Sequence, residues 1–328
     1  MIERLFLNKR HSQLLGYVIG FLLLLCFPHQ VLAQKNYHWW NLKHNWDGAS
    51  NWTSYMLYSP GYMGPNALPV PRMLDGYLNH NINIEPGAGL HIQPGELIID
   101  GSISLYFPFA KGSAALEINH TSIEYYKTDT LLRDERRARN LHVEGFATSD
   151  INVTSYFTLL RGSRWPDMVL RINVRTASGT RLADARHTDA PGYFFDLTFG
   201  KTLPRKDATS SHQWRFYSML GFYAWQTGFS LYRQNDAFLF GAGSQLKVQK
   251  HTFSTELAGY LGYLQLRDDP IVLRVIYEYN LTKNSFRLKY QKGLNDIYHH
   301  SLHGSIVFFI QPGFSHKNKE NKSLSLRR

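Results

Sequence analysis

Two histidines and two serines alternate near the end of the chain, in the stretch YHHSLHGSIVFFI at residues 298–310. His299, Ser301, His303 and Ser305 are spaced by two residues, so they would share one face of a β-strand. A histidine beside a serine can act as the general base for a nucleophile. The same residues can also form the polar face of an amphipathic strand. Which of the two applies depends on the protein that surrounds this strand.

The chain begins with the pattern of a secretory signal peptide, residues 1–33. Basic residues precede an uncharged apolar stretch at residues 14–27, and Val31 and Ala33 occupy the −3 and −1 positions of a cleavage site before Gln34. A transmembrane anchor is the alternative. The apolar stretch is shorter than the about 20 residues that a spanning helix needs. We therefore expect export with cleavage near Ala33 and Gln34.

The only cysteine, Cys26, lies within the predicted signal peptide, so the mature chain would contain none. Leu24 and Leu25 precede it where a lipoprotein signal has small residues, which argues against a lipid anchor. An exported chain without disulfides must be stabilised by size, by oligomerisation or by burial in a membrane. After the signal peptide, no apolar run is long enough for a transmembrane helix.

The second half of the chain reads as successive amphipathic strands. In PIVLRVIYEYNL (residues 270–281), SFRLKYQ (285–291) and DMVLRINVRT (167–176), apolar and polar residues alternate. The polar faces of these segments carry Arg171, Arg175, Arg274, Glu278, Arg287 and Lys289. The segments at 270–281 and 167–176 are longer than the five or six residues of an average soluble strand and have about the length of a transmembrane strand, 9–11 residues.

These segments predict an all-β fold, a transmembrane antiparallel β-barrel of about 12 strands with 10–14 as the range. We place the barrel at residues 89–314, with a basic tail at 315–328. Aromatic residues near strand ends are expected to form interfacial girdles. They are Tyr217, Tyr223, Trp225, Tyr277 and Tyr279.

The joins between strands differ in length. Short joins are expected at 250–251, 266–270 and 283–284, and longer ones at 177–192, 204–211 and 227–236. Outer-membrane barrels have short periplasmic turns and longer outer loops. The two sets of joins would therefore lie at opposite ends of the barrel.

Together, the signal peptide, the cysteine-free mature chain and the serial amphipathic strands resemble outer-membrane β-barrel proteins of Gram-negative bacteria. The resemblance covers about two thirds of the chain and implies a place in the outer membrane. It implies outer-membrane lipid and the barrel-assembly machinery as partners, and no cofactor. One departure is the tail after Phe314, since such proteins commonly end on an aromatic residue of the last strand. No nucleic-acid module accompanies the net charge of +11, so nucleic acid is not expected as a partner.

The pair His299 and Ser301 resembles the His-x-Ser pair of outer-membrane phospholipase A and lipid A deacylase. The resemblance implies His299 as base and Ser301 as nucleophile of a membrane-embedded lipid hydrolase. In those enzymes the pair meets lipid at the outer barrel surface. Here the opposite face is the apolar one, with Leu302, Ile306 and Phe308, so the pair is expected to point inward. The Asn that follows Ser in the deacylase motif is also absent.

A charged loop between two strands is a second candidate site. Asp184, Arg186, His187 and Asp189 gather in TASGTRLADARHTDAPGYFF, residues 176–195. The loop would bind a ligand, fold into the lumen as a constriction, or remain a solvated loop with an internal ion pair. Loops on a rigid scaffold often carry function.

The segment at residues 34–88 is rich in aromatic residues and has weak periodicity. Trp39, Trp40, Trp46 and Trp52 are four of the seven tryptophans. Their rings suit membrane interfaces and stacking on sugars, and the segment would equally enter the barrel and pack as a plug. Plug or interfacial packing is favoured over a carbohydrate site, and a position in the periplasm is a further alternative for the segment. The stretch PNALPVP reads as an extended linker.

The inward-facing charges allow two functions. Arg171, Arg175, Arg274, Arg287 and Lys289 are offset by Asp196, Glu256 and Glu278. An open lumen with this excess of cations would favour anions, whereas a closed lumen would hold the same residues in a salt-bridged core.

The sequence thus predicts a non-enzymatic outer-membrane barrel that acts either as a narrow channel or as a structural and binding barrel. A small anionic solute or a glycan would be its ligand, and no metal site is expected. The alternatives are the lipid hydrolase with Ser301 and His299, and a secreted soluble protein that binds glycans.

Overall fold

The structure is a computed structural model that describes residues 37–162, 164–204 and 212–310. The chain divides into two units, residues 1–39 and 40–328, and the second contains the sheet. The predicted signal peptide, its Cys26 and the predicted tail at 315–328 lie outside the described residues. Within the described residues, no helix has the length and apolarity to cross a membrane.

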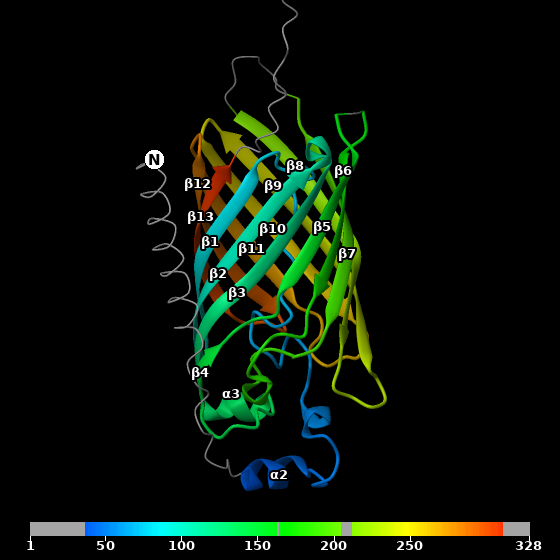
Figure 1. Ribbon diagram of the computed structural model, residues 1–328, viewed down its shortest axis with the longest axis vertical. Coiled ribbons are helices and arrows are strands. Elements are labelled where there is room, and N and C mark those ends of the chain that lie inside the picture. The colour runs from blue at the N-terminus through cyan, green and yellow to red at the C-terminus, as the bar shows by residue number, and fades with distance from the viewer. Residues whose placement is uncertain (1–36, 163, 205–211, 311–328) are drawn as a thin grey trace, which may run out of the picture. The chain divides into compact units, whose positions relative to one another are not determined.

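The described strands form one closed antiparallel barrel (Figure 1). They are β1 (Ile82–Gln93), β2 (Glu96–Phe109), β3 (Ala114–Thr128), β4 (Val143–Ala147), β5 (Asn152–Leu160), β6 (Asp167–Arg175), β7 (Gly192–Thr202), β8 (His212–Gln226), β9 (Gln234–Val248), β10 (His251–Gly262), β11 (Ile271–Asn280), β12 (Asn284–Asn295) and β13 (His300–Ile310). Apart from β4 and β5, neighbours in sequence pair with each other, and β1 pairs with β13 to close the ring. Because β4 and β5 both pair with β3, they form one interrupted strand, and the described barrel has 12 strands, as predicted.

Alternation along the strands gives the barrel its two faces. In β6, Ile172 and Val174 are exposed whereas Arg171, Asn173 and Arg175 are buried in the interior. The outer face of the other strands is likewise apolar. Its exposed residues include Ile123, Phe216, Leu220, Phe238, Phe253, Val275, Leu288, Leu302 and Phe308. Such a continuous apolar exterior suits lipid and contradicts the soluble alternative.

The predicted aromatic girdle is wrong in part. Tyr217, Tyr223 and Trp225 on β8 are buried inside the barrel, because their register places them opposite the exposed Phe216 and Leu220. Three aromatic rings that sequence position alone assigned to the membrane interface therefore belong to the interior.

The two ends of the barrel differ. The short-turn end carries the connections at 110–113, 161–166, 249–250 and 281–283. The long-loop end carries those at 94–95, 129–142, 176–191, 227–233, 263–270 and 296–299. The predicted short join at 266–270 is part of a long-loop-end connection, which corrects its assignment. The predicted join at 204–211 falls at the short-turn end, and most of it lies outside the described residues.

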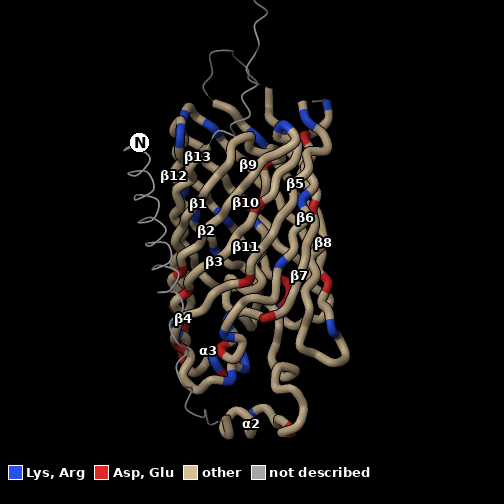
Figure 2. The backbone as a smooth tube through the Cα atoms, viewed as in Figure 1, with Lys and Arg blue, Asp and Glu red and all other residues tan. Residues whose placement is uncertain are grey.

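Short helices lie before the first strand and at connections between strands. They are α2 (His38–His44), the 3₁₀ turns η1 (Trp52–Tyr55), η2 (Ala110–Gly112) and η3 (Leu182–Asp184), and α3 (Thr130–Glu135). Asp129 caps α3 by accepting a hydrogen bond from the Leu132 amide. Figure 2 shows Lys, Arg, Asp and Glu side by side around α3 at the long-loop end. The α3 loop thus brings charges of both signs to this end.

The barrel begins at Ile82, earlier than the predicted residue 89. Before it, residues 56–79 pass through the lumen from the long-loop end to the short-turn end, as their wall contacts show. Tyr58 meets Trp225 near the long-loop end of β8, and Asn79 meets Tyr106 near the short-turn end of β2. We call residues 56–79 the plug segment.

Candidate functional site

The plug segment has little regular backbone, and its sequence explains how it is held. It contains Pro65, Pro69 and Pro71. Proline lacks a backbone N–H, so the segment needs fewer acceptors on the wall, while its carbonyl groups still need donors. Those donors come from side chains of the barrel.

Four arginines of the wall donate to successive carbonyl groups of the plug segment, and we call them the arginine ladder. Arg175 donates to the carbonyl oxygen of Ala67. Arg274 donates to Val70 at 2.5 Å and to Pro71 at 3.0 Å. The remaining rungs are Arg171 to Arg72 at 2.7 Å and Arg215 to Asp75 at 2.6 Å. The ladder satisfies buried carbonyl groups that would otherwise destabilise the segment.

An apolar cluster supports the ladder at mid-lumen. Leu68, Val70 and Met73 of the plug segment pack against the wall. The wall side of this cluster comprises Tyr217, Met219, Tyr223, Trp225, Leu239, Tyr260 and Val272. This packing explains why aromatic residues of β8 face inward.

Backbone contacts fix the plug segment at the long-loop end. The amide of Gly64 donates to the carbonyl oxygen of Ala185 at 2.9 Å, and that of Gly61 to Arg267 at 3.1 Å. A Cβ at Gly64 would lie 2.5 Å from the Arg186 guanidinium, so only glycine allows this close passage. The 176–191 loop and the plug segment are therefore packed directly on each other.

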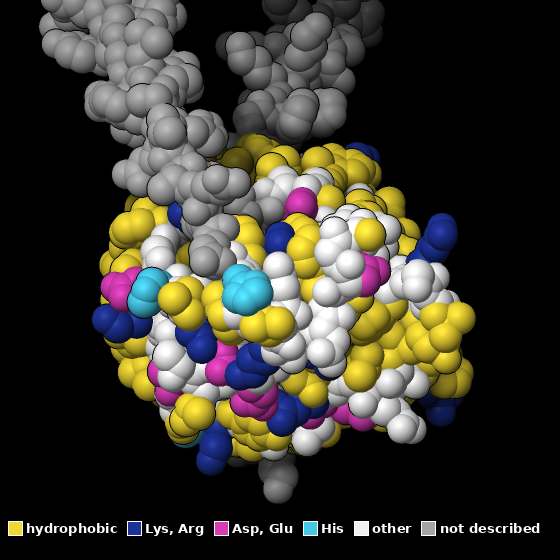
Figure 3. Space-filling model, turned by 90° about the horizontal axis from the view of Figure 1, so that it is seen from below, with side chains coloured by type: hydrophobic (Ala, Val, Ile, Leu, Met, Phe, Trp, Pro, Cys, Tyr) yellow, Lys and Arg dark blue, Asp and Glu magenta, His cyan; other side chains and the backbone are white. Residues whose placement is uncertain are grey.

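Buried charges join this loop to the barrel wall. Arg186 lies 2.5 Å from Glu96 and 2.7 Å from Glu124, and Arg136 of the α3 loop lies 2.6 Å from Glu96. The side chains of Arg186, Glu96 and Glu124 have no exposed surface. We call these four residues the buried ion-pair network. Figure 3, seen from the long-loop end, shows charged and apolar side chains gathered on the part of this end that the grey atoms leave visible.

The predicted loop site is therefore divided. Asp184, Arg186 and His187 are buried, whereas Asp189 is exposed. Asp184 accepts hydrogen bonds from Tyr126 and Asn140 rather than pairing within the loop. The loop packs on the plug segment at the long-loop end of the barrel.

Two histidines beside the network are kept neutral by burial. Loss of hydration lowers the pKa of His187 to about 4, and burial likewise lowers the pKa of His299 to about 4. His299 lies 2.7 Å from Glu96, while the ring nitrogens of His187 have no hydrogen-bond partner among the described residues. Nε2 of His187 lies 3.7 Å from Glu124, so protonation would place a charge in the interior with this carboxylate nearby and no solvent.

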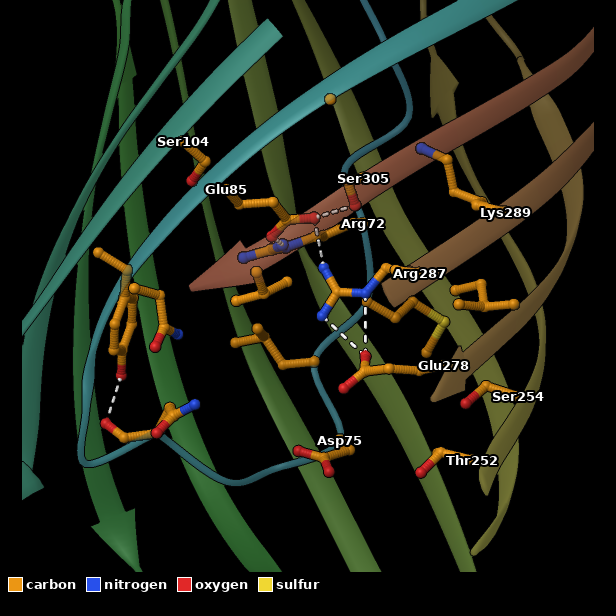
Figure 4. A pocket seen from close by; sticks show the side chains of 18 of the residues that line it. Arg72, Asp75, Glu85, Ser104, Thr252, Ser254, Glu278, Arg287, Lys289 and Ser305 are labelled. Atoms are coloured by element: carbon orange, nitrogen blue, oxygen red, sulfur yellow. Dashed lines mark hydrogen bonds and ion pairs between the residues drawn. The ribbon is translucent and has the colours of Figure 1, made fainter. Parts of the chain in front are cut away.

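The short-turn half of the lumen contains a polar cavity of about 610 Å³ beside the plug segment (Figure 4). Arg287 lies 2.9 Å from Glu278 and 2.7 Å from Glu85. Arg72 of the plug segment lies 3.0 Å from Glu117. Other polar lining residues include Asp75, Ser104, Thr252, Ser254, Glu256, Arg274, Lys289, His303 and Ser305. Carboxylates accompany the cations, so the lining is mixed in charge.

The predicted lumen residues thus fall into two groups. Arg171, Arg175 and Arg274 hold the plug segment. Glu278, Arg287 and Lys289 line the cavity, and Lys289 forms no ion pair with a described residue. Of these residues, Arg171 pairs with Asp196, Arg274 with Glu256 and Arg287 with Glu278.

The histidine and serine face of β13 points inward, as expected from its apolar opposite face. Ser301 does not pair with His299. Its Oγ lies 2.8 Å from Nδ1 of His91, whose Nε2 lies 2.6 Å from Asp100. This chain of contacts has the order serine, histidine, aspartate, yet Ser301 is only 1% exposed and does not border the cavity. The base carried over from the lipid hydrolases is therefore not the residue that contacts this serine.

The tryptophans outside the lumen pack around one arginine. The Arg139 guanidinium lies 4.8 Å from the ring centre of Trp52 and 5.4 Å from those of Trp40 and Trp46. Trp40 is fully buried, and its indole N–H donates to the carbonyl oxygen of Arg137 at 2.8 Å. These rings contact protein and anchor the chain before the plug segment. Trp39 belongs to the other unit of the chain.

Solved structures share this barrel. An outer-membrane channel from Pseudomonas putida F1 matches with a TM-score of 0.51 and 9% identity, over 74% of this chain and 100% of that one. The chain has the fold of an outer-membrane β-barrel protein. LpxR from Salmonella typhimurium has a TM-score of 0.44 and 8% identity, over 69% of this chain and 100% of that one. The KdgM porin has a TM-score of 0.40 and 10% identity, over 68% and 98%.

These identities show the fold and no closer relationship. No family model matches the chain, and no curated protein matches it. The barrel fold and its apolar exterior agree with the outer-membrane location predicted from the sequence.

Several site residues had no signal in the sequence. His91, Asp100, Glu96 and Glu124 lie on the first three strands, where the alternation is weaker than in the second half of the chain. The carbonyl acceptors of the plug segment have no side-chain signature at all. A proline-rich stretch before a barrel with inward arginines is the one pattern that points to them.

Proposed function

We propose that the protein is an outer-membrane channel held shut by its plug segment. The long-loop end faces the outside, in keeping with the loop lengths of outer-membrane barrels. Passage of a solute requires that residues 56–79 leave the arginine ladder. The polar cavity then becomes part of the pathway.

The observation that carries the proposal is the ladder itself. Arg171, Arg175, Arg215 and Arg274 donate to backbone carbonyl groups of one continuous segment. The barrel wall has its own complete set of strand pairings, so removal of the segment leaves the wall hydrogen bonds intact. A closed wall with a separately held segment is the arrangement that a plugged channel requires.

The charges around the cavity indicate which class of solute the channel would accept. The cationic lining residues are balanced by carboxylates: Lys247, Lys289 and three arginines face Asp75, Glu85, Glu117, Glu256 and Glu278. A mixed lining of this kind favours small polar solutes with hydrogen-bonding groups over simple anions. A small glycan fits this chemistry as well as a zwitterion does.

The lipid hydrolase is not supported by a comparable observation. Ser301 is nearly inaccessible, and among the described residues the cavity next to it is bordered by His303 and Ser305 instead.

Planar-bilayer recordings test the channel. We expect little conductance from the mature wild-type protein and frequent openings from the double variant Arg175→Gln/Arg274→Gln, in which two rungs of the ladder are weakened. Arg287→Gln is the matched control, because it removes a lumen charge that bonds Glu85 and Glu278 rather than the plug segment. A third variant replaces residues 56–79 with a flexible linker. If that variant folds, as judged by heat-modifiable gel mobility, and does not conduct, the channel function is wrong.

A further inference from the structure

Three potential metal ligands converge inside the barrel, at the edge of the lumen cavity. Nitrogen atoms of His91 and His303 and a carboxylate oxygen of Asp100 lie within 4.8 Å of one another. His91 and Asp100 are buried, and His303 is half-buried and borders the cavity. We propose that these three residues bind a divalent transition-metal ion of the zinc class.

The barrel register builds this site on three adjacent strands. Gly89 on β1 pairs with Asp100 on β2 and with His303 on β13, and His91 follows two residues later on the same inward face. A Cβ at Gly89 would lie 2.8 Å from both carboxylate oxygens of Asp100 and 2.8 Å from the His303 ring. Because Gly89 has no side chain, the space between Asp100 and His303 stays free.

The ligand types suit zinc. Two imidazoles and one carboxylate form a frequent three-ligand set for catalytic zinc, with further positions left for water or solute. Ligand atoms bound to one ion at about 2.0–2.2 Å lie at most about 4.4 Å apart. Small side-chain rotations bring atoms within 4.8 Å into that range. The lumen cavity provides the entry path, since His303 forms part of its lining.

The surrounding hydrogen bonds prepare the ligands. In the structure, Nδ1 of His91 lies 2.8 Å from Ser301 Oγ and its Nε2 lies 2.6 Å from Asp100, so the ring donates from Nε2 to the carboxylate and accepts from the serine hydroxyl. A bound ion would take the place of the proton between Nε2 and the carboxylate, which move apart to coordinate it, and the Nδ1–H would then donate to Ser301 Oγ. Asn66 of the plug segment donates to Asp100 at 3.1 Å and so orients the carboxylate. His303 makes no hydrogen bond with a described residue, so its ring is available to an ion.

One charge opposes the site. Lys289 is the register partner of His303 on β12, and Figure 4 places it on the cavity wall near Ser305. Its positive charge reduces the affinity for a dication. Removing this charge is therefore expected to strengthen metal binding, whereas removing a ligand weakens it. A structural role for the three residues would not produce these opposite effects.

Equilibrium dialysis of the untagged mature protein in detergent, stripped with a chelator and reloaded with Zn²⁺, tests the site. We expect one Zn²⁺ per chain, at least tenfold weaker binding in His303→Asn, and tighter binding in Lys289→Met. Loading with Co²⁺ should give visible absorption bands that His303→Asn abolishes. Heat-modifiable mobility verifies that each variant is folded.

His300→Asn is the matched control, because His300 lies on the same strand but on its exposed outer face. It should leave Zn²⁺ binding unchanged. Binding well below one ion per chain would overturn the proposal. Affinity that is equal in wild type and in folded His303→Asn would overturn it as well. None of these outcomes depends on conductance, so the metal site and the channel are tested separately.

Discussion

The two halves of the lumen use the same kinds of charged residues in opposite surroundings. At the long-loop end, Arg186, Glu96 and Glu124 have no exposed side-chain surface. In the short-turn half, Arg287 and Glu278 are 27% and 21% exposed beside the lumen cavity. The distances within the ion pairs are similar, so hydration is the main difference between the two halves.

The difference in hydration gives the two halves different roles: the long-loop end holds the lumen closed, and the short-turn half offers charges that a solute can contact. Charges taken out of water are stable only when every partner is present, so the buried ion-pair network fixes two loops and the plug segment in one arrangement. Charges that keep water tolerate changes of partner at small cost. A solute that enters the cavity can therefore exchange contacts with Arg287 and Glu278, whereas the network at the other end resists opening.

The largest expected effect is the loss of a network arginine. Arg186→Met leaves Glu124 without its closest cation and Glu96 with one fewer, and we expect the free energy of unfolding to fall by about 3–5 kcal/mol. Arg287→Met, the matched change in the hydrated half, should cost about 1 kcal/mol or less. Urea unfolding in detergent, followed by tryptophan fluorescence, measures both. Equal losses in the two variants would contradict the division of the lumen into a dry and a hydrated half.

Much of the barrel could be predicted from the sequence because alternation is a local signal. In a strand such as β6, the apolar Ile172 and Val174 alternate with Arg171 and Arg175, and this alternation indicates which face is which. Strand number and the inward direction of Ser301 followed from the same pattern. The beginning of the barrel was less certain, since Gly87 and Gly89 interrupt the alternation of β1.

The candidate sites could not be predicted in the same way, because their members meet only through long-range register. Ser301 meets His91 across the β1–β13 seam, which joins the first strand to the last. The arginines could be assigned inward, but their acceptors are backbone carbonyl groups that any sequence supplies. For Tyr223 and Trp225, amphipathic rings fit a membrane interface and a lumen cluster equally well, and only the packing against Leu68 and Val70 decides.

Acid pH should lower the stability of the long-loop half of the lumen, where the buried charges and histidines lie. His187 and His299 have a pKa of about 4 in the folded protein, below the ordinary value of 6.5. Between these values the unfolded chain binds more protons, so stability is present above pH 6.5 and is lost as pH falls toward 4. We expect each histidine to contribute about 3 kcal/mol to this loss.

The test is the slope of unfolding free energy against pH between 6.5 and 4. His187→Gln should flatten it, whereas His142→Gln, which changes an exposed histidine of the α3 loop, should not. An unchanged slope in His187→Gln would show that the protein accommodates the charged imidazole. The long-loop half would then be hydrated, in contradiction to the burial of its charged side chains.

The smallest effect is expected from an ion pair at the same end that remains in water. Arg267 and Glu135 join the 263–270 loop to α3, and their side chains are 41% and 40% exposed. Glu135→Gln should lower the free energy of unfolding by less than about 1 kcal/mol, and by less still in high salt, because solvent and ions screen the pair. Urea unfolding at low and high ionic strength measures both values. A loss as large as that of Arg186→Met would mean that surface contacts between loops, rather than the buried ion-pair network, keep the long-loop end closed.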